Sequence, residues 1–301
     1  MSNYWAINSN SQKTNSQKMR AFTLIELLVV IAIIALLLSI VMPALNLVKK
    51  KAASAVCLTN VKNLSLAWFS YQEENNSRIV NPNTTNYDAD PRVEASGWVC
   101  NPIKANGTNC TDQPVTNPVT DEDEIRGIEK GALFVYLKAP DVYHCPADNQ
   151  RRSFQGDGGK IFRTYSSPRA MKRVKKFTNI TTPGLRFNFI EEHEVRNWNQ
   201  GTWDFYNMPE HDEWEWRDPV GKNHGDSGII GFCDGHAEVH KWQESYTLDR
   251  IDYYFAHVNE ISGWGRGGLN DVYTRINAGA PPKEQDRDIA FMVKSWADRG
   301  R

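Results

Sequence analysis

The sequence predicts an α+β protein, in which one long N-terminal helix, half transmembrane and half amphipathic, packs against an antiparallel β-sheet head. Three observations support this prediction. A single long apolar run stands near the N-terminus of a chain with 24% charged residues. An amphipathic repeat continues that run, and a hairpin signal marks the C-terminal half of the chain. The length of 301 residues is enough for one or two domains.

Residues 1–21 are interpreted as a leader that does not belong to the fold. They contain no Asp or Glu, and Asn, Ser and Gln make up most of the segment besides the basic residues Lys13, Lys18 and Arg20. A segment this polar cannot bury enough apolar surface to fold. The small residue Ala21 precedes the apolar run, so cleavage after Ala21 would remove the leader and leave the helix on the mature chain.

The run from Phe22 to Met42 is long enough to cross a bilayer. A helix of about 21 residues spans roughly 30 Å, the thickness of the hydrocarbon core. We therefore predict a transmembrane helix over residues 22–43. The alternatives are an uncleaved signal anchor and a buried core helix, and the run is too long and too uniformly apolar for the second of these. The polar residues that interrupt the run are Thr23, Glu26 and Ser39.

Glu26 is the informative residue of this helix. A carboxylate within a membrane helix costs several kcal/mol unless it is paired or lies near the interface. If the chain is cut after Ala21, the new α-amino group of Phe22 could neutralise Glu26 of a neighbouring subunit in an assembly. The alternative is that Glu26 lies at the level of the lipid headgroups and stays solvated. The physics alone favours neither interpretation.

The segment Arg20-Ala21-Phe22-Thr23-Leu24-Ile25-Glu26 resembles the type III signal of type IV pilins and type II secretion pseudopilins. The resemblance implies that prepilin peptidase cuts between Ala21 and Phe22 and methylates the new N-terminus of Phe22. It places Glu26 at the fifth mature position, where the family has its glutamate, and Pro43 at the twenty-second, where pilins often have a proline. Ala21 stands directly before the expected cut, where the family usually has glycine, so the residue at this position is still small.

This resemblance also implies a function and a location. The chain is expected to be a pilin-like structural subunit, a pseudopilin or minor pilin of a type II secretion or type IV pilus-like system. Its partners would be prepilin peptidase, other pilin-like subunits and membrane lipid. Basic residues on both sides of the span leave the orientation undecided, and the family implies a single pass with the head outside the cytoplasmic membrane.

Other function classes find little support in the sequence. The formal net charge of −1 gives no argument for nucleic acid as a partner. The sequence contains no G-x-S-x-G, no P-loop and no H-E-x-x-H motif, so we expect no enzyme activity.

Beyond Pro43 the apolar residues recur at spacings of three and four, which predicts an amphipathic continuation of the helix over residues 44–76. Pro43 lacks a backbone N–H and should kink the helix where it leaves the membrane. The helix is expected to end at Asn75-Asn76-Ser77. The apolar stripe consists of Leu45, Val48, Ala52, Val56, Cys57, Val61, Leu64, Trp68 and Tyr71.

Residues 77–242 are predicted to form the α+β head, and residues 243–301 a C-terminal extension. Thr120 and Asp123 have the spacing of a capping box at the start of a short helix. Asp234-Gly235 separates the apolar runs 228–233 and 236–242, which is the strongest short signal for a β-hairpin.

A second resemblance involves this hairpin. His224, nine intervening residues and Asp234-Gly235 resemble the H-X9-DG motif of a large group of pilin-like proteins. The segments 57–62 (CLTNVK) and 145–148 (CPAD) resemble other recurring pieces of that group. The function of the head is poorly defined in this group, so the resemblance adds little mechanism. Taken alone, Asp234-Gly235 is most simply a turn.

His236, Glu238 and His240 alternate, so on a strand all three would point to one face. With His224 or Glu191 nearby they could bind a divalent metal. Exposed polar residues on the outer face of a hairpin are the commoner case, and we expect no other cofactor.

The five cysteines would lie in an oxidising compartment if the head is exported. Cys57 faces the head in the predicted helix, so we expect a Cys57–Cys145 disulfide. Cys100 and Cys110 are close in a loop, which suits a second disulfide, and Cys233 would remain a small buried residue in a strand. Connectivity does not follow from sequence alone.

Aromatic residues crowd the segment 198–216 among Asp, Glu and Asn. Exposed rings beside carboxylates and amides suit glycan stacking, whereas buried rings would fill the core of the head. This segment supports an alternative function, a membrane-anchored cell-surface binding module that uses the signal only for export and display. The aromatic residues are Trp198, Trp203, Phe205, Tyr206, Trp214 and Trp216.

Overall fold

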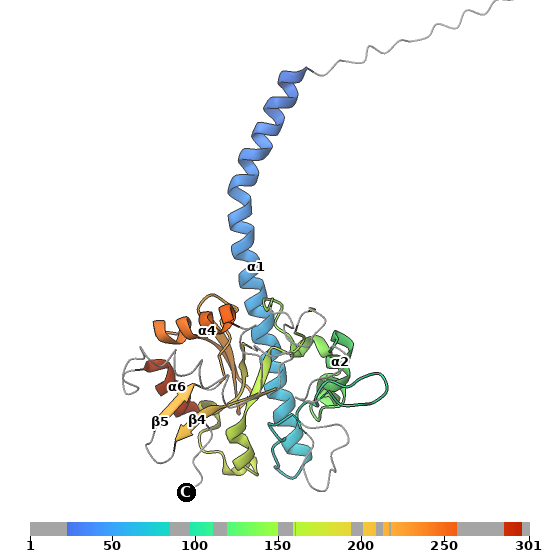
Figure 1. Cartoon of the computed structure of the whole chain (residues 1–301), viewed down its shortest axis with the longest axis vertical. Helices are drawn as coiled ribbons and strands as arrows, with labels where there is room; N and C mark the ends of the chain where they lie inside the picture. Colours follow the sequence, from blue (N-terminus) through green and yellow to red (C-terminus); the bar gives the residue numbers. More distant parts are fainter. Residues whose placement is uncertain are drawn as a thin grey trace, which may run out of the picture. The chain divides into compact units, whose positions relative to one another are not determined.

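The structure is a computed structural model of the chain (Figure 1). The residues that it describes are 23–84, 97–110, 119–149, 159, 161–193, 201–208, 213–216, 218–257 and 286–296, with the backbone alone for 205–208, 213–216 and 253–257. The chain forms two compact units, Met1–Val48 and Lys49–Arg301. Helix α1 (Leu24–Glu74) contributes residues to both units.

The part of α1 in the first unit has no buried face. The large apolar side chains between Leu24 and Met42 are each 46–79% exposed. The most apolar 18-residue window of α1 has a mean hydropathy of 3.2, and the helix is long enough to cross a membrane. Each large apolar side chain is worth about 1.5–3 kcal/mol when it leaves water, so this surface requires lipid or other apolar helices around it.

Helix α1 runs through Pro43 without interruption. The kink expected at this proline stays a prediction. The helix ends at Glu74 because Asn76 and Ser77 adopt the left-handed conformation, with φ of 56° and 60°. The Ser77 backbone N–H donates to the Gln72 carbonyl at 2.8 Å and so satisfies one of the last carbonyls of the helix. The predicted end of the helix is confirmed.

The second unit is built on a five-stranded sheet with the order β3-β1-β2-β6-β7. Neighbouring strands pair antiparallel, except β1 and β3, which are parallel. A separate two-stranded sheet pairs β4 (Phe205–Met208) with β5 (Glu213–Trp216). The α+β class, with a long helix and a mostly antiparallel sheet, is confirmed. The five strands are β1 (Tyr165–Pro168), β2 (Phe187–Glu191), β3 (Thr202–Trp203), β6 (Ser227–Phe232) and β7 (Ala237–Lys241).

Short helices connect these strands or pack around them. The α-helices are α2 (Asp121–Glu129), α3 (Phe134–Leu137), α4 (Ser245–His257) and α6 (Arg287–Ser295). The 3-10 helices are η1 (Pro140–Tyr143), η2 (Arg169–Arg173), η3 (Phe177–Asn179) and η4 (Pro183–Leu185).

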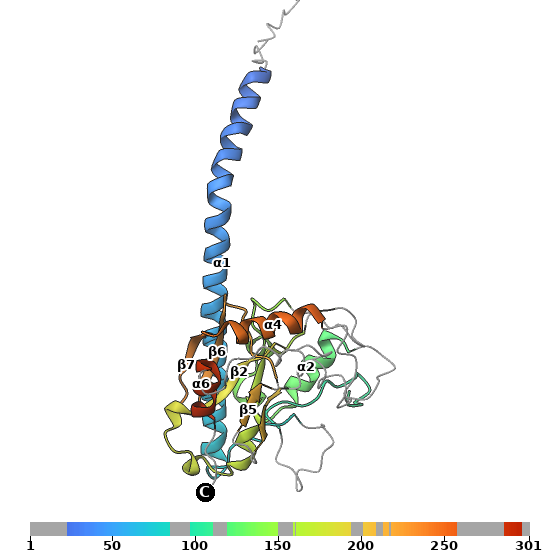
Figure 2. The ribbon, with the colours of Figure 1, turned by 60° about the vertical axis from the view of Figure 1, so that its left-hand side comes forward.

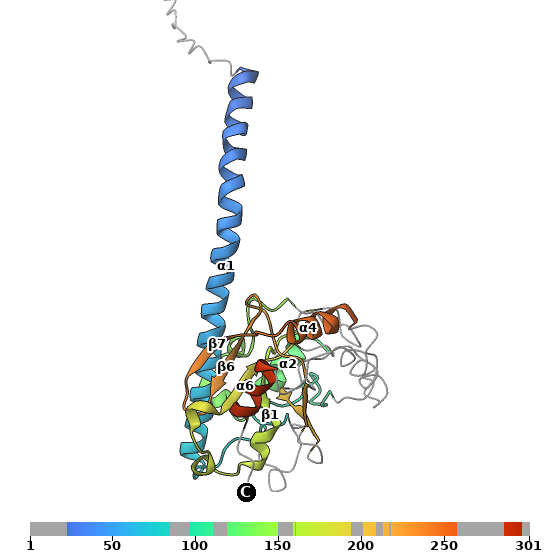
Figure 3. The ribbon, with the colours of Figure 1, turned by 90° about the vertical axis from the view of Figure 1, so that its left-hand side faces the viewer.

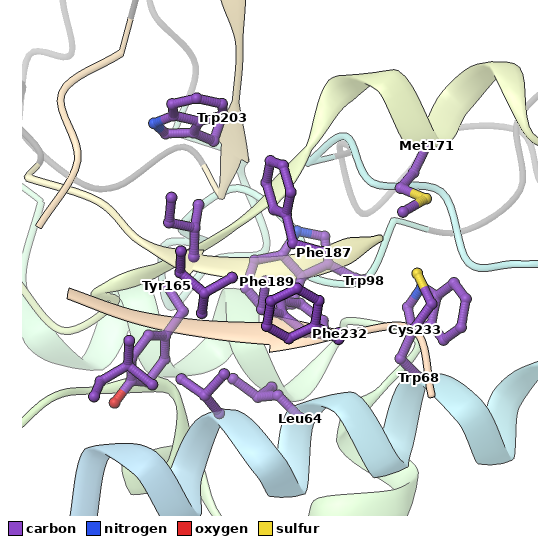
Figure 4. Packing of buried hydrophobic residues seen from close by; sticks show 14 of the residues in the cluster. Leu64, Trp68, Trp98, Tyr165, Met171, Phe187, Phe189, Trp203, Phe232 and Cys233 are labelled. Atoms are coloured by element: carbon purple, nitrogen blue, oxygen red, sulfur yellow. The ribbon is translucent and has the colours of Figure 1, made fainter. Parts of the chain in front are cut away.

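The part of α1 in the second unit lies alongside β6 and β7 (Figure 2 and Figure 3). Leu64 and Trp68 point from the helix toward the sheet, and both are fully buried (Figure 4). The helix lies close to Gly231 of β6, where a Cβ atom would lie only 2.4 Å from Ser65 Oγ. Glycine at this position therefore lets the helix approach the sheet.

The other face of the sheet is covered by the C-terminal part of the chain. Trp296, directly after α6, lies with its ring centroid 5.7 Å from both Phe187 and Trp203. Figure 4 shows Trp203 on the opposite side of the strands from Leu64. Ile251 of α4 is 1% exposed. Described residues of the predicted extension 243–301 thus contribute to the core of the head.

Two local predictions for the head are confirmed. Strands β6 and β7 form the predicted hairpin, paired from Ser227 with Lys241 to Gly231 with Ala237. Gly235 in the turn has φ of 93°, which glycine adopts without strain. Helix α2 starts at the predicted capping box, in which Thr120 and Asp123 bind each other's backbone N–H groups.

Asp123 holds the N-terminus of α2 in a network of charges. Its Oδ2 lies 2.6 Å from Lys104 Nζ and accepts from the Thr120 N–H, while its Oδ1 pairs with Arg126. Burial raises the pKa of Asp123, but the hydrogen bonds from Lys104 and Thr120 lower it, and the net pKa lies below its ordinary value. Because folding lowers this pKa, the charged carboxylate stabilises the head above the unfolded pKa of about 4. That contribution is lost as the pH falls through the folded pKa.

We expect Asp123→Asn to lower the melting temperature at pH 7 by roughly 4–10 °C, since it removes charge-assisted hydrogen bonds from a buried group. At acid pH, as the pH falls through the lowered folded pKa of Asp123, the difference from the wild type should shrink, because the wild-type carboxyl becomes protonated too. Thermal unfolding of the full chain in detergent at both pH values measures this. Glu122→Gln changes an exposed carboxylate in the same turn and should have little effect at either pH. A difference independent of pH would contradict the assignment.

Candidate functional site

Four residues from separate segments meet in one buried cluster in the second unit. Cys57 belongs to α1, Cys145 follows η1, Glu191 ends β2 and His224 precedes β6. Their sulfur, oxygen and nitrogen ligand atoms all lie within 4.8 Å of one another. The cluster therefore joins the segments CLTNVK and CPAD to the histidine of the H-X9-DG motif.

The contacts within the cluster are short and shielded from water. Cys57 and Cys145 are joined in a disulfide, with their Cα atoms 5.2 Å apart. His224 Nε2 lies 3.4 Å from Cys145 Sγ and 3.1 Å from Glu191 Oε1. Glu191 Oε2 accepts from the Ile229 backbone N–H at 3.0 Å. The two cysteines and Glu191 are 0% exposed, and the His224 side chain is 2% exposed.

A β-bulge directs Glu191 into this cluster. The pairing of β2 with β6 shifts register between Phe187 and Phe189. Ser65 of α1 donates to Asn188 Oδ1 at 3.0 Å, so Asn188 faces the helix. In a regular strand the alternation from Asn188 would send Glu191 to the opposite face. The extra residue of the bulge reverses that alternation and brings the carboxylate to the helix side.

The second predicted disulfide is wrong. Cys100 and Cys110 are both buried and are not bonded to each other. The Cys100 backbone N–H donates to the Gly127 carbonyl, which holds Cys100 against α2, and its thiol donates to the Lys130 carbonyl. The Cys110 backbone N–H instead donates to the Pro102 carbonyl. Cys233 is buried directly after β6, and burial raises the pKa of its thiol.

Glu26 lies in the first turn of α1, where its carboxylate caps the helix. Glu26 Oε2 accepts hydrogen bonds from the Thr23 backbone N–H at 2.9 Å and from the Thr23 hydroxyl at 2.8 Å. Thr23 Oγ1 in turn accepts from the Glu26 N–H at 3.2 Å. The two residues form a capping box. This role was not predicted, although the spacing Thr-x-x-Glu that signals it is present in the sequence.

Both Thr23 bonds go to one carboxylate oxygen of Glu26. Within the described residues, Oε1 accepts no hydrogen bond. The helix N-terminus also favours a negative charge at this position. Ala21 and Phe22, the predicted cleavage site, lie outside the described residues.

Residues 16–42 match the model of the prokaryotic N-terminal methylation motif. The match covers the end of the leader, the expected cleavage site and the exposed apolar part of α1. The chain carries a prepilin-type N-terminal signal. No curated protein and no solved structure matches the chain.

The prepilin-type signal implies a prepilin-like protein that prepilin peptidase processes. Together with the exposed apolar helix it indicates a membrane-anchored protein with a single span. Proteins of the pilin-like family are typically structural and not enzymatic. The match ends at residue 42, so it does not extend to the H-X9-DG motif of the head.

The residues of that motif lie at opposite ends of β6. His224 belongs to the buried cluster, whereas Asp234 and Gly235 form the turn to β7. Asp234 Oδ1 accepts from the His236 backbone N–H at 3.1 Å and pairs with His236 Nδ1. Burial raises the pKa of Asp234, and the bonds from His236 lower it to a net value below the ordinary one. The motif therefore contributes to two different places in the head.

The metal ligands predicted on the hairpin do not meet. His236 pairs with Asp234, and His240 Nδ1 lies 3.9 Å from Glu238 Oε1. The His240 ring stacks on Phe291 of α6, with centroids 3.9 Å apart. Phe291 of α6 thus covers the ring of His240. Within the part of the chain that the structure describes, the ligand atoms close enough to share one ion are those of the buried cluster.

The aromatic-rich segment 198–216 has one described aromatic side chain, Trp203, and it is not available to a ligand. Trp203 is fully buried, with its ring 5.9 Å from Phe187 and 5.7 Å from Trp296. It fills the core of the head and cannot stack on a glycan. The other aromatic side chains of the segment lie outside the described ones: Trp198, Phe205, Tyr206, Trp214 and Trp216.

Proposed function

We propose that this chain is a pilin-like structural subunit, a pseudopilin or minor pilin of a type II secretion or type IV pilus-like system. The observation that carries the proposal is the prepilin-type signal at the start of an apolar helix whose side chains are exposed on every face. Such a helix is stabilised by lipid before assembly and by neighbouring subunit helices afterwards. The head then lies outside the cytoplasmic membrane.

Assembly in this proposal depends on Glu26. Cleavage after Ala21 creates an amine on Phe22, and Glu26 of one subunit pairs with the amine of its neighbour. Because the capping box uses Oε2, Oε1 can accept from that amine while the helix start stays intact. An unpaired carboxylate among apolar helices costs several kcal/mol. The pairing would therefore select the axial register between neighbouring subunits in which Glu26 of one subunit lies beside the Phe22 amine of the other.

N-terminal mass spectrometry of the mature protein tests the processing step. We expect a chain that begins at Phe22 and carries one added methyl group. Ala21→Leu enlarges the residue before the cut and should leave the leader attached. Ala6→Leu, the same change elsewhere in the leader, should be processed like the wild type. A membrane-bound product that still begins at Met1 would refute the processing step.

Glu26→Gln separates assembly from helix capping. Glutamine retains an oxygen that can accept the Thr23 bonds, and it removes the charge. We expect normal membrane insertion and cleavage, with at least a tenfold loss of the chain from sheared filaments and from complexes with other pilin-like subunits, which corresponds to about 1.4 kcal/mol. If the variant assembles as well as the wild type, Glu26 has no role in subunit pairing.

A further inference from the structure

We propose that Cys57, Cys145, Glu191 and His224 form a Zn²⁺ site when the two cysteines are in the dithiol form. The disulfide links α1 to the segment after η1, and a metal ion in its place would link α1 to that segment and also to Glu191 of β2. This inference is independent of the proposed assembly function, since all four residues lie in the second unit.

The donor set fits zinc. Two sulfurs, an imidazole nitrogen and a carboxylate oxygen are donors that zinc takes in tetrahedral sites, whereas Mg²⁺ and Ca²⁺ prefer oxygen alone. Tetrahedral donors bound 2.0–2.3 Å from one zinc lie roughly 3.2–3.8 Å from each other. The four ligand atoms here lie within 4.8 Å of one another. Small side-chain rotations after the disulfide opens would bring them to this spacing.

The charges in the cluster also favour a cation. Glu191 is fully buried, and within the described part of the chain it forms no ion pair with Lys or Arg. His224 Nε2 faces both the Cys145 sulfur and the Glu191 carboxylate, and one N–H cannot satisfy both well. Opening the disulfide adds two groups that become thiolates only at high cost in a buried site. One Zn²⁺ bound at the centre offsets two of the three negative charges that the thiolates and the carboxylate bring together.

The chemistry balances as thiol–disulfide exchange followed by metal binding. A dithiol reductant gives two electrons and two protons to the Cys57–Cys145 disulfide and itself becomes a disulfide. The two thiols that form then release their protons to solvent as Zn²⁺ binds. Oxidation of the dithiol by a disulfide-bearing oxidant reverses both steps and releases the ion.

Metal analysis of the full chain in detergent tests the proposal. One sample is kept oxidised, and the other is reduced with a dithiol and freed of reductant under nitrogen. Both are equilibrated with zinc sulfate and desalted. We expect about one zinc per chain in the reduced sample and none in the oxidised one. Bound zinc should also protect Cys57 and Cys145 from alkylation.

Variants identify the ligands. Cys145→Ser and Glu191→Gln should each lower zinc affinity at least about tenfold. Cys233→Ser makes the same change as Cys145→Ser at another buried cysteine and should keep one zinc. Glu191→Gln retains the disulfide, so its fold can be verified by circular dichroism in the oxidised form before reduction. Cobalt(II) added to the reduced wild type should give thiolate charge-transfer absorption that is weaker in Cys145→Ser, which keeps only the Cys57 thiolate.

Three results would overturn the proposal. A folded dithiol chain that retains no stoichiometric zinc excludes the site. Equal zinc affinity in Glu191→Gln and Cys233→Ser excludes this ligand set. A reduced chain that unfolds and that zinc sulfate does not refold shows that the disulfide alone serves as the link. None of these results bears on cleavage at Phe22 or on assembly through Glu26.

Discussion

Leu64→Ala is expected to destabilise the head by about 2–5 kcal/mol, whereas Leu66→Ala should cost at most about 1 kcal/mol. Leu64 is 0% exposed and packs into the core between α1 and the sheet (Figure 4), while Leu66 is 45% exposed. Both variants remove the same atoms from the same helix, so differences in helix propensity cancel. The difference between them therefore measures the packing of α1 on the sheet.

Urea unfolding of the full chain in detergent, followed by tryptophan fluorescence, measures both values. The midpoint should fall sharply for Leu64→Ala, with an unchanged dependence on urea concentration. Trp68, one turn beyond Leu64 and fully buried, provides a fluorophore within the affected core. Equal losses in the two variants would contradict the described orientation of α1, because Leu66 would then be as buried as Leu64.

Elements that depend on near neighbours in the chain could be predicted from the sequence. The apolar run of α1 follows from composition and length. The start of α2 follows from Thr120 and Asp123, and the β6–β7 hairpin from Asp234-Gly235. In each case the decisive contacts join residues only a few positions apart. The capping box of Thr23 and Glu26 is equally local, and the spacing Thr-x-x-Glu signals it. The prediction for Glu26 instead considered only the cost of a carboxylate in a membrane.

Two features that depend on distant segments could not be predicted from local patterns. Glu191 reaches Cys57 only because a bulge in β2 reverses the alternation of the strand, and no local pattern announces that bulge. His240 is covered by Phe291, which lies 51 positions further along the chain in a segment without a recognisable motif. The residues that could hold a metal are therefore those of the buried cluster and not those of the hairpin. Tertiary packing decides this, and composition and spacing do not encode it.

Val30→Arg combined with Ile34→Arg is expected to release the chain from the membrane. The two side chains are 46% and 49% exposed and lie one helical turn apart near the middle of the apolar run. In water such positions accept arginine at little cost. At the centre of a membrane helix each arginine costs about 2.5–3.5 kcal/mol, so the pair costs about 5–7 kcal/mol.

The control for this pair is Val56→Arg, in the same helix but within the second unit. Val56 is 49% exposed, the same fraction as Ile34, so exposure in the single chain does not distinguish the two positions. The two positions differ only in the medium that is expected around them, which is lipid or apolar helices at Ile34 and water at Val56. Carbonate extraction of membranes should therefore move the double variant to the supernatant and leave Val56→Arg in the pellet with the wild type. If the double variant stays in the pellet, the helix does not lie in lipid, and the exposed apolar surface must be covered by protein instead.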